Sequence, residues 1–265
     1  MKVTTLHDRD EIASLLHRNP WLHLYELGDL DDFFWKYTTW YGLEIEAGVR
    51  QVVLLYTGTA LPVLLALAEE PLTEMKELLR LLVSLLPRRL YAHLSGDLAG
   101  VLSGEYRVES HGEHYKMALK GDLLAEGVDT SETTRLTASD RHDLETLYRA
   151  SYPGNWFDPR MLETGRYYGI RSSGKLVSAA GVHVFSPEYE VAALGNITTH
   201  PDLRGVGLAA KVTTKLCQEL QRDVKYIGLN VKAENRSAIA CYEKLGFERI
   251  ASYEECSLEL KERLA

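Results

Sequence analysis

Two stretches of the chain, residues 106–119 and residues 247–260, align with each other without gaps, in their rhythm of apolar and polar residues more than in identity. Each has the length of a long strand and follows a glycine-containing helix exit. The same order of expected elements precedes both: strands, one strong amphipathic helix, a short strand and a short helix. The chain is therefore expected to contain two copies of one α/β unit.

The boundary between the copies is expected near Asp129. The sequence KGDLLAEGVDTSETT, residues 120–134, is polar, rich in Gly, Asp, Ser and Thr, and has no apolar periodicity, as is typical of a linker. Two domains follow from this boundary, residues 1–128 and residues 129–265. A chain of 265 residues with 45% hydrophobic side chains is long enough for two cores of ordinary size.

In the second copy, Ser139 or Asp140 provides an N-cap signal for a helix. Residues 166–173 and residues 175–186 are then expected to form two antiparallel strands joined at Gly174, where a positive φ suits a tight hairpin. A further strand follows and stops at an X-Pro step. The predicted fold class is mixed α/β, in which each copy has a mostly antiparallel sheet flanked by helices.

The composition restricts the class of protein. No apolar run approaches the roughly 20 residues that a membrane span requires, and Thr, Gly and Pro interrupt the nearest candidate, residues 51–68. Because the amino-terminal segment lacks the basic and apolar regions of a signal peptide, we expect a cytoplasmic protein without membrane insertion. The net charge of −8 and the absence of a Lys/Arg block argue against a nucleic-acid partner.

The cysteines give no indication of a metal or redox site. Cys217, Cys241 and Cys256 lie on apolar-periodic segments and lack the C-x-x-C spacing of zinc and redox motifs. We expect them to be small reduced core residues, and we expect no metal centre.

The sequence THPDLRGVGLAAKV, residues 199–212, predicts an anion-binding turn. Backbone N–H groups in the first turn of a helix lack internal acceptors and carry partial positive charge, which attracts phosphate. Gly205 and Gly207 leave these amides uncovered, and Arg204 adds a cation suited to phosphate oxygens. A glycine pair before a helix also often serves only as a turn. A Walker-type loop is absent, and the third glycine of a dinucleotide fingerprint is missing.

The run Arg204, Gly205, Val206, Gly207, Leu208, Ala209 resembles the R/Q-x-x-G-x-G/A loop of the GCN5-related N-acetyltransferase (GNAT) superfamily. Further on, NRSAIACYEKLGF, residues 235–247, resembles the second signature of the same superfamily. Both motifs occur in the expected order, and the resemblance covers roughly residues 132–260. The two-copy layout is similar to that of glycine N-acyltransferase-like proteins, whose second half is called FR47-like.

The resemblance implies a binding cleft for acetyl-coenzyme A between a splayed fourth and fifth strand, at residues 191–199 and residues 226–232. The loop amides of residues 204–209 would bind the pyrophosphate. The backbone of Ile197, Thr198 and Thr199 would pair with the pantetheine arm, and one strand amide there would stabilise the oxyanion. Asn235 is expected to contact the cofactor, to cap the helix that follows, or to do both.

For catalysis, the resemblance implies that Tyr242 protonates the leaving thiolate. Tyr242 also fits an ordinary half-buried aromatic residue. The general base is unassigned, because Ala193 occupies the position of the strand glutamate found in the histone-acetylating members. Glu190, His183 and His200 are each better explained as structural or exposed, and a water relay or an already neutral amine needs no such residue.

In the first copy, Glu69, Glu70 and Glu74 surround the equivalent helix start and would repel a pyrophosphate. The first copy is therefore expected to support the second, by covering a sheet edge or shaping the acceptor pocket. The aromatic segment DDFFWKYTTWYG, residues 31–42, is a candidate lining of that pocket, although such density is more typical of core. Trp156 and Phe157 are better candidates.

The predicted function is transfer of an acetyl or short acyl group from a coenzyme A thioester to a primary amine, by direct attack in a ternary complex. The acceptor is a small-molecule or peptide amine. The alternatives are a non-catalytic acyl-CoA-binding regulator, which would bind without turnover, and a nucleotide enzyme, which would respond to ATP. The sequence leaves the acceptor, the acyl length and the oligomeric state open.

Overall fold

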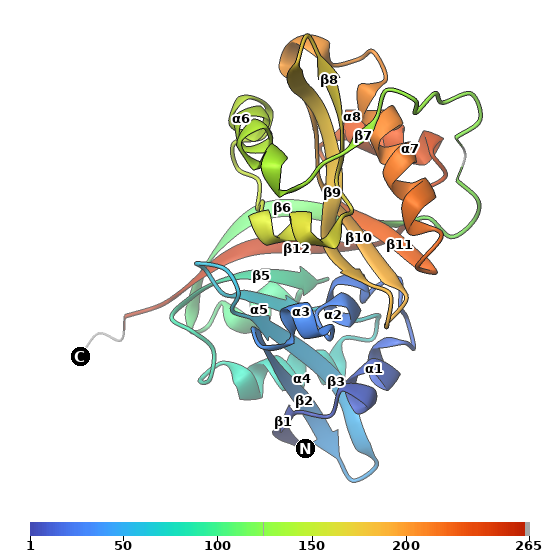
Figure 1. Ribbon diagram of the computed structural model, residues 1–265. Coiled ribbons are helices and arrows are strands. Elements are labelled where there is room, and N and C mark those ends of the chain that lie inside the picture. Colours follow the sequence, from blue (N-terminus) through green and yellow to red (C-terminus); the bar gives the residue numbers. More distant parts are fainter. Residues whose placement is uncertain (124, 263–265) are drawn as a thin grey trace. The chain divides into compact units, whose positions relative to one another are not determined.

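The computed structural model describes residues 1–123 and 125–262. The chain folds into two compact units (Figure 1). The first unit comprises Met1–Lys116, Lys232–Glu234 and the residues from Ile250 onward, and the second comprises Met117–Val231 and Asn235–Arg249. The first unit thus includes most of the last strand of the chain. The domain boundary expected near Asp129 stays a prediction.

In the first unit, neighbouring strands follow the order β1-β2-β3-β4-β5-β12-β6. The pairs are antiparallel from β1 to β4, parallel between β4 and β5, and antiparallel between β5 and β12. The strands are β1 Lys2–Leu6, β2 Thr38–Ile45, β3 Gly48–Tyr56, β4 Val63–Ala66, β5 Arg89–Ser95, β6 Tyr106–Ala118 and β12 Glu248–Leu260. The helices are α1 Arg9–Leu16, α2 Leu24–Gly28, α3 Asp32–Trp35, α4 Thr73–Leu82 and α5 Leu98–Leu102.

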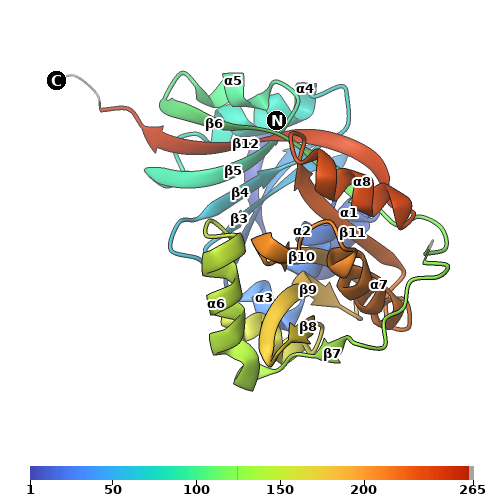
Figure 2. The same ribbon diagram turned by 90° about the horizontal axis from the view of Figure 1, so that it is seen from above.

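The second unit has the strand order β11-β10-β9-β8-β7. In Figures 1 and 2, α6 and α7 lie on opposite faces of the strands β8 to β10. The strands are β7 Thr134–Arg135, β8 Tyr168–Ser172, β9 Lys175–Ser186, β10 Val191–Thr199 and β11 Tyr226–Lys232. The α-helices are α6 Arg141–Ser151, α7 Leu208–Leu220 and α8 Arg236–Lys244, and the 3-10 turns are η1 Ala138–Asp140, η2 Pro159–Thr164 and η3 Pro201–Leu203.

The two copies expected from the sequence are confirmed by the order of elements. Apart from α3, η1 and η3, the elements of the two copies correspond in order: β1, α1, α2, β2, β3, β4, α4, β5, α5 and β6 match β7, α6, η2, β8, β9, β10, α7, β11, α8 and β12. The two closing strands have the same length. The hairpin at Gly174 is also confirmed, since its φ is +78°.

Asp140 is the N-cap position of α6, one of the two residues expected there, but its side chain makes no capping bond to this helix. Thr137 caps the preceding 3-10 turn η1, where it forms a capping box with Asp140. Asp140 Oδ2 accepts a hydrogen bond from the Thr137 backbone N–H at 2.8 Å. The helix α6 therefore continues a 3-10 turn rather than beginning at its own capping side chain.

The core of the first unit lies between its sheet and α4. Residues at alternate positions of a strand face opposite sides of the sheet. Leu90, Ala92 and Leu94 of β5 are buried with Met75 and Leu78 of α4, so the residues between them on β5 belong to the opposite face. Figures 1 and 2 show α4 and α5 on one face of this sheet and α1 to α3 on the other.

The aromatic segment of residues 31–42 contributes to the core. The side chains of Phe34 and Trp40 are buried. The Phe34 ring meets Tyr56 edge-on with centroids 6.4 Å apart, and Trp35 stacks on Trp40 at 6.5 Å. Their burial and packing agree with the interpretation that a high density of aromatic residues indicates a hydrophobic core.

Cys217 and Cys256 are buried free thiols, and Cys241 is partly buried. Among residues 1–123 and 125–262, His, Cys, Asp and Glu form no group of three arranged to hold a metal ion. No helix within the same ranges combines the length and the apolar character needed to cross a membrane.

Candidate functional site

The loop between η3 and α7 has the geometry of an anion site. Gly205 and Gly207 have φ of +82° and +87°, in the left-handed region that favours glycine. A Cβ atom added at either position would meet no atom within 4 Å, so both positions border open space. Gly207 caps α7 without a side-chain hydrogen bond. Within the described part of the chain, the N–H groups of residues 205–210 donate no hydrogen bond.

Arg204 anchors this loop to the rest of the unit. Its Nε donates to the Thr199 carbonyl at 3.2 Å, and one terminal nitrogen donates to the Ser151 carbonyl at 3.0 Å. The guanidinium therefore joins the ends of β10 and α6. The sequence predicted a phosphate contact for Arg204 and did not anticipate this anchoring, which leaves the other terminal nitrogen as a donor for a ligand.

The strands β10 and β11 diverge beside this loop. They pair in parallel from Val191 with Tyr226 to Leu194 with Leu229. Beyond that pair, no further register is formed between the described residues of the two strands, although β10 continues to Thr199 and β11 to Lys232. The splayed fourth and fifth strands expected from the sequence are thus present. We call this opening the fork.

A bulge lies at the mouth of the fork. The register of β10 with β9 shifts between Gly195 and Thr198, and Asn196 has a φ of +54°. Tyr148 Oη donates to the Asn196 carbonyl at 3.2 Å, and Asn196 Nδ2 donates to Tyr167 Oη at 3.1 Å. All three side chains are buried. Sequence reasoning missed these residues; the only local signal was an asparagine inside a strand pattern.

The bulge directs particular backbone groups into the fork. The His200 N–H donates to the Val177 carbonyl of β9 at 2.8 Å. Successive residues of an antiparallel strand turn their N–H and C=O groups alternately toward and away from the partner. Thr198 therefore faces β9, whereas the backbone groups of Ile197 and Thr199 face the fork. Of the three residues predicted to contact pantetheine, two present their main chain to the opening.

The side chains of the two threonines have structural roles. Thr198 Oγ1 donates to Ser151 Oγ at 2.9 Å, and Thr199 Oγ1 lies 2.9 Å from Ser178 Oγ. Both are buried. These bonds connect β10 to α6 and to β9, so the edge facing the fork is held in a fixed position.

Tyr242 is 8% exposed on α8 and packs against Phe247, with ring centroids 6.0 Å apart. Burial raises the pKa of Tyr242, so its hydroxyl remains protonated at neutral pH. Within the described residues this hydroxyl makes no hydrogen bond, which leaves its proton available for a ligand.

Asn235 caps α8, since its Oδ1 accepts from the Ala238 N–H at 3.2 Å. The capping role expected for Asn235 is therefore observed.

The residues considered as the general base lie at different places in or next to β9 and β10. Ala193 is buried and carries no titratable group. Glu190 precedes β10 in a left-handed turn with φ +55°, at the end of the strand remote from the loop. His200 follows the other end of β10, with Nδ1 3.7 Å from Asp202 Oδ2. His183 lies beside the bulge.

The contacts of Gly195 place the His183 ring on one face of the sheet. A Cβ atom at Gly195 would lie 1.9 Å from His183 Cδ2, and one at Gly181 would lie 2.2 Å from the Tyr167 ring. Gly181 and Gly195 are directly paired, so their side-chain positions share a face. His183 therefore lies on the same face as Tyr167. The two glycines leave room for the two rings.

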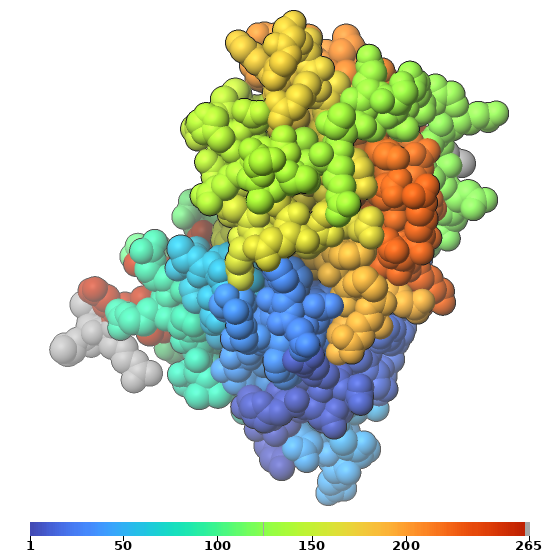
Figure 3. All heavy atoms as spheres, in the orientation of Figure 1, coloured from blue at the N-terminus to red at the C-terminus, as the bar shows by residue number. Residues whose placement is uncertain are grey.

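That face is the one covered by α6. Phe157 packs between Tyr148 of α6 and Tyr167, with centroids 5.1 Å and 5.9 Å apart. Trp156, next to it, is 44% exposed. In Figure 3, residues of about 135–165, light green to yellow, form much of the visible surface of the second unit. Phe157, one of the two aromatic residues expected to border the acceptor, thus lies on the His183 side of the sheet.

Comparison with known proteins gives the family. A sequence profile of the acetyltransferase (GNAT) family matches residues 133–247. The [ribosomal protein bS18]-alanine N-acetyltransferase of Escherichia coli K12 is 31% identical over 121 residues, which are 45% of this chain and 79% of that enzyme. The chain belongs to the GNAT acetyltransferase family. The N-alpha-acetyltransferase RimI of Mycobacterium tuberculosis matches this GNAT protein at 33% identity over 88 residues, 32% of this chain and 52% of that one.

Solved structures show the two-copy fold of this GNAT protein. A Drosophila protein matches with a TM-score of 0.70 at 13% identity, covering 97% of this chain and 98% of that one. A tandem GNAT protein of the clavulanic acid biosynthesis pathway matches with a TM-score of 0.58 at 14% identity, covering 99% and 100%. By its family, the protein is an acyl-CoA-dependent acetyltransferase.

Proposed function

We propose that the protein transfers the acetyl group of acetyl-CoA to a primary amine, by direct attack within a complex of enzyme, donor and acceptor. The observation that supports this most is the row of N–H groups at residues 205–210 that donate to no described residue, beside the fork where β10 and β11 no longer pair with each other. A diphosphate group meets the requirements of the loop, because its charge suits a helix N-terminus and its oxygens accept several N–H bonds.

The pantetheine arm is proposed to extend the sheet inside the fork. The Ile197 and Thr199 main chains would pair with its amides, as a strand added to an open edge. The donor substrate supplies the acetyl thioester at the inner end of the arm. There we propose that an N–H of the bulged segment donates to the thioester oxygen, which gains negative charge when the amine attacks.

Two side chains are proposed to move protons. His183 would accept the proton of the attacking amine, from the face where Phe157 packs. Tyr242 would donate to the sulfur as the carbon–sulfur bond breaks, which its protonated state permits. The nitrogen–carbon bond forms and coenzyme A leaves as the thiol, so atoms and charge balance.

The acceptor is proposed to be a primary amine on a small molecule or at a peptide N-terminus. The curated relatives are named as an alanine N-acetyltransferase of a ribosomal protein and as an N-alpha-acetyltransferase. The net charge of −8 favours the approach of cationic amines. The exposed ring of Trp156 offers a flat apolar contact at the edge of the site.

The decisive experiment titrates coenzyme A and acetyl-CoA into the purified chain and measures heat, and then follows thiol release with a panel of amines. Binding of coenzyme A together with amine-dependent thiol release supports the proposal. Binding without turnover for any amine would instead support a regulatory acyl-CoA sensor. A protein that binds neither molecule at millimolar concentration contradicts both.

The assignment of His183 has its own test. We expect His183→Gln to lower kcat/KM by about 100-fold and to remove the acidic limb of its pH profile, because general-base catalysis contributes on that order. His200→Gln, at the end of β10, serves as the matched control and should change kcat/KM little. Full activity with an unchanged pH profile in His183→Gln would reject the assignment.

A further inference from the structure

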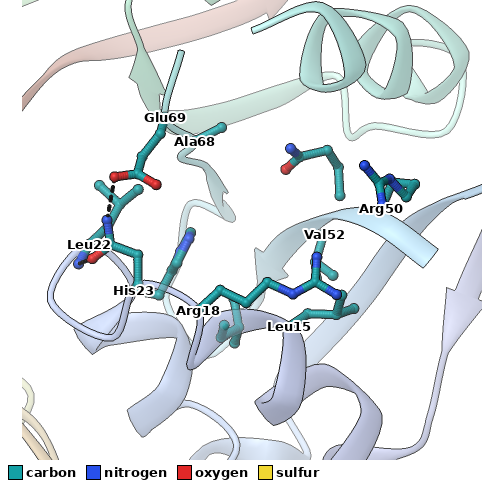
Figure 4. Close-up of a pocket in the computed structure, with 11 residues that line it drawn as sticks. Leu15, Arg18, Leu22, His23, Arg50, Val52, Ala68 and Glu69 are labelled. Carbon is teal, nitrogen blue, oxygen red and sulfur yellow. Dashed lines mark hydrogen bonds between the residues drawn. The ribbon is translucent and has the colours of Figure 1, made fainter. Parts of the chain in front are cut away.

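The first unit has a hollow of its own (Figure 4). It has a volume of about 150 Å³ and is bordered by α1, by β3 and by the segment that follows β4. Arg18, Arg50 and His23 lie around it. The ring of His23 connects this hollow to α2, since His23 Nδ1 is 3.1 Å from Glu26 Oε1.

Beyond Glu26, the sheet face opposite α4 is unusually polar. On β12, Glu255 is the centre of a cluster of side chains from β5, β6 and β12. Tyr253 Oη donates to Glu255 Oε1 at 2.8 Å, and Tyr91 donates to Oε2. His93 Nε2 and His114 Nε2 each lie 3.5 Å from a Glu255 oxygen. The Glu255 carboxylate is thus fully satisfied by the protein.

Three other polar atoms near this cluster form no hydrogen bond with the described residues. Lys116 is 2% exposed, and it makes no ion pair or side-chain hydrogen bond with the described residues. Its Nζ instead lies over the rings of Tyr25 and Tyr253, at 5.1 Å and 5.6 Å from their centroids. Glu26 is 3% exposed, and its Oε2 has no partner among those residues. The buried Nδ1 of His93 also has none.

These groups lie within electrostatic range of one another. Burial lowers the pKa of Lys116, while Glu26 and Glu255 oppose that shift. Burial also acts on Glu26, but His23 and Lys116 outweigh it and lower the pKa of this carboxyl. Asp29 at the end of α2 is different, because burial and Glu26 raise its pKa. The buried face therefore holds an amine, Lys116 Nζ, and a carboxylate oxygen, Glu26 Oε2, that form no hydrogen bond or ion pair with each other.

A buried hydrogen-bonding atom without a partner costs free energy, so buried polar atoms are usually satisfied by the protein, by water or by a ligand. We propose that these atoms mark a binding site in the first unit for a small zwitterion, such as a free α-amino acid, whose carboxylate binds Lys116 Nζ and whose ammonium group binds Glu26 Oε2. The rings of Tyr25 and Tyr253 border this site.

The proposal is tested by calorimetry and thermal unfolding of the full chain, without acyl-CoA, against the common amino acids at millimolar concentration. At least one amino acid should bind and raise the Tm. Lys116→Met and Glu26→Gln should each weaken that binding by at least about 10-fold, because each removes one charge contact. Acetate and ethylamine, which carry half of the zwitterion each, should bind at least as weakly.

Two controls separate this site from others. Lys36→Met removes an exposed lysine that also lies over a tyrosine ring, at 4.9 Å from Tyr37, and should leave binding unchanged. Gly205→Asp, in the second unit, should also leave it unchanged, so a failure of the proposed acyl transfer does not affect this result. The proposal is overturned if no amino acid binds, or if both variants bind like the parent chain. A crystal structure grown with the amino acid that shows only water between Lys116 Nζ and Glu26 Oε2 also overturns it, even where a variant fails to fold.

Discussion

The equivalent strand pairs of the two units end differently. In the first unit β4 and β5 pair from Val63 to the last residue of β4, Ala66, and the Ala68 N–H then donates to Ser95 Oγ at 3.1 Å. In the second unit the pairing of β10 and β11 stops at Leu194, and the strands diverge. The first pair is closed by its own side chains. Two copies with one order of elements thus differ in whether a ligand can complete the sheet.

The turns after these strands show the same contrast. In the first unit Leu67 and Leu72 are buried, and Glu70 Oε2 accepts the Leu72 N–H at 3.2 Å. A carboxylate thus occupies the helix start, as the sequence indicated. In the second unit Val206 is 65% exposed between two glycines, and no side chain among the described residues caps α7. The physical lesson is that a helix N-terminus binds an anion only where the protein does not supply its own.

The largest effect is expected from placing a carboxylate in the loop before α7, as the first unit has one at its equivalent helix start. Gly205→Asp should reduce coenzyme A affinity by about 1,000-fold or more, because the new charge repels a diphosphate and covers the amides. Calorimetry measures the loss. Gly174→Asp is the matched control, since Gly174 has a φ of +78° and also borders open space. Equal affinities in the two variants would show that the loop does not bind the diphosphate.

The first unit contains a buried histidine, His93, which should make its folded state less stable at acidic pH. Burial lowers the pKa of His93 from 6.5 to about 4, so the folded chain keeps it neutral. The unfolded chain therefore binds more protons below pH 6.5, and the free energy of unfolding should fall by about 3 kcal/mol between pH 6.5 and 4. The charged groups facing His93 are Glu255, Lys116 and Glu26, together with His114.

Denaturant unfolding at several pH values, followed on probes in the first unit, measures this slope. His93→Gln should flatten it, because the amide takes up no proton. His7→Gln, at an exposed position, is the control and should retain the slope of the parent chain. A slope in His93→Gln as steep as in the parent would show that other groups cause the acid sensitivity.

The sequence predicted the elements well because their signals are local. Glycine at a hairpin, apolar residues at four-residue steps and an X-Pro step are encoded within a few residues of each other, and β10 and β11 occupy the ranges expected. The bulge could not be predicted in this way. Tyr148 lies 48 positions from Asn196, and their hydrogen bond exists only once the sheet has formed.

The same limit applies to the polar cluster of the first unit. Glu255 joins Tyr91 across 164 positions, and no local pattern in either segment indicates their contact. The anchoring of Arg204 to Ser151 spans 53 positions. For Arg204, the sequence predicted the residue but not its second task, because a guanidinium suits carbonyl oxygens as well as phosphate.

The proposed general acid, Tyr242, is a further difference between the two units. The helix α8 carries Tyr242, whereas the corresponding helix α5 has the sequence LAGVL and no titratable side chain. Tyr242→Phe should lower kcat by about 10- to 100-fold while the Kd for coenzyme A changes little, because the hydroxyl would act on the leaving sulfur. Unfolding should be almost unaffected, since this hydroxyl makes no bond within the described residues.

Steady-state kinetics with a saturating amine measures the change in kcat. Tyr226→Phe, on β11, is a control that removes a tyrosine hydroxyl from the same unit and should leave kcat intact. Wild-type kcat in Tyr242→Phe would show that the thiolate leaves without this acid, and would return Tyr242 to the role of a half-buried aromatic residue.

The smallest effect is expected from a variant that removes one hydrogen bond of the bulge. The short strand β4 of the first unit has no such bulge. Tyr148→Phe removes the hydrogen bond to the Asn196 carbonyl at 3.2 Å and should cost about 1 kcal/mol of unfolding free energy. Because Asn196 Nδ2 remains bonded to Tyr167, the bulge should persist with a looser backbone, and kcat/KM should fall several-fold. A stability loss without any change in kcat/KM would mean that the bulge supports the fold but does not position the N–H groups that face the fork.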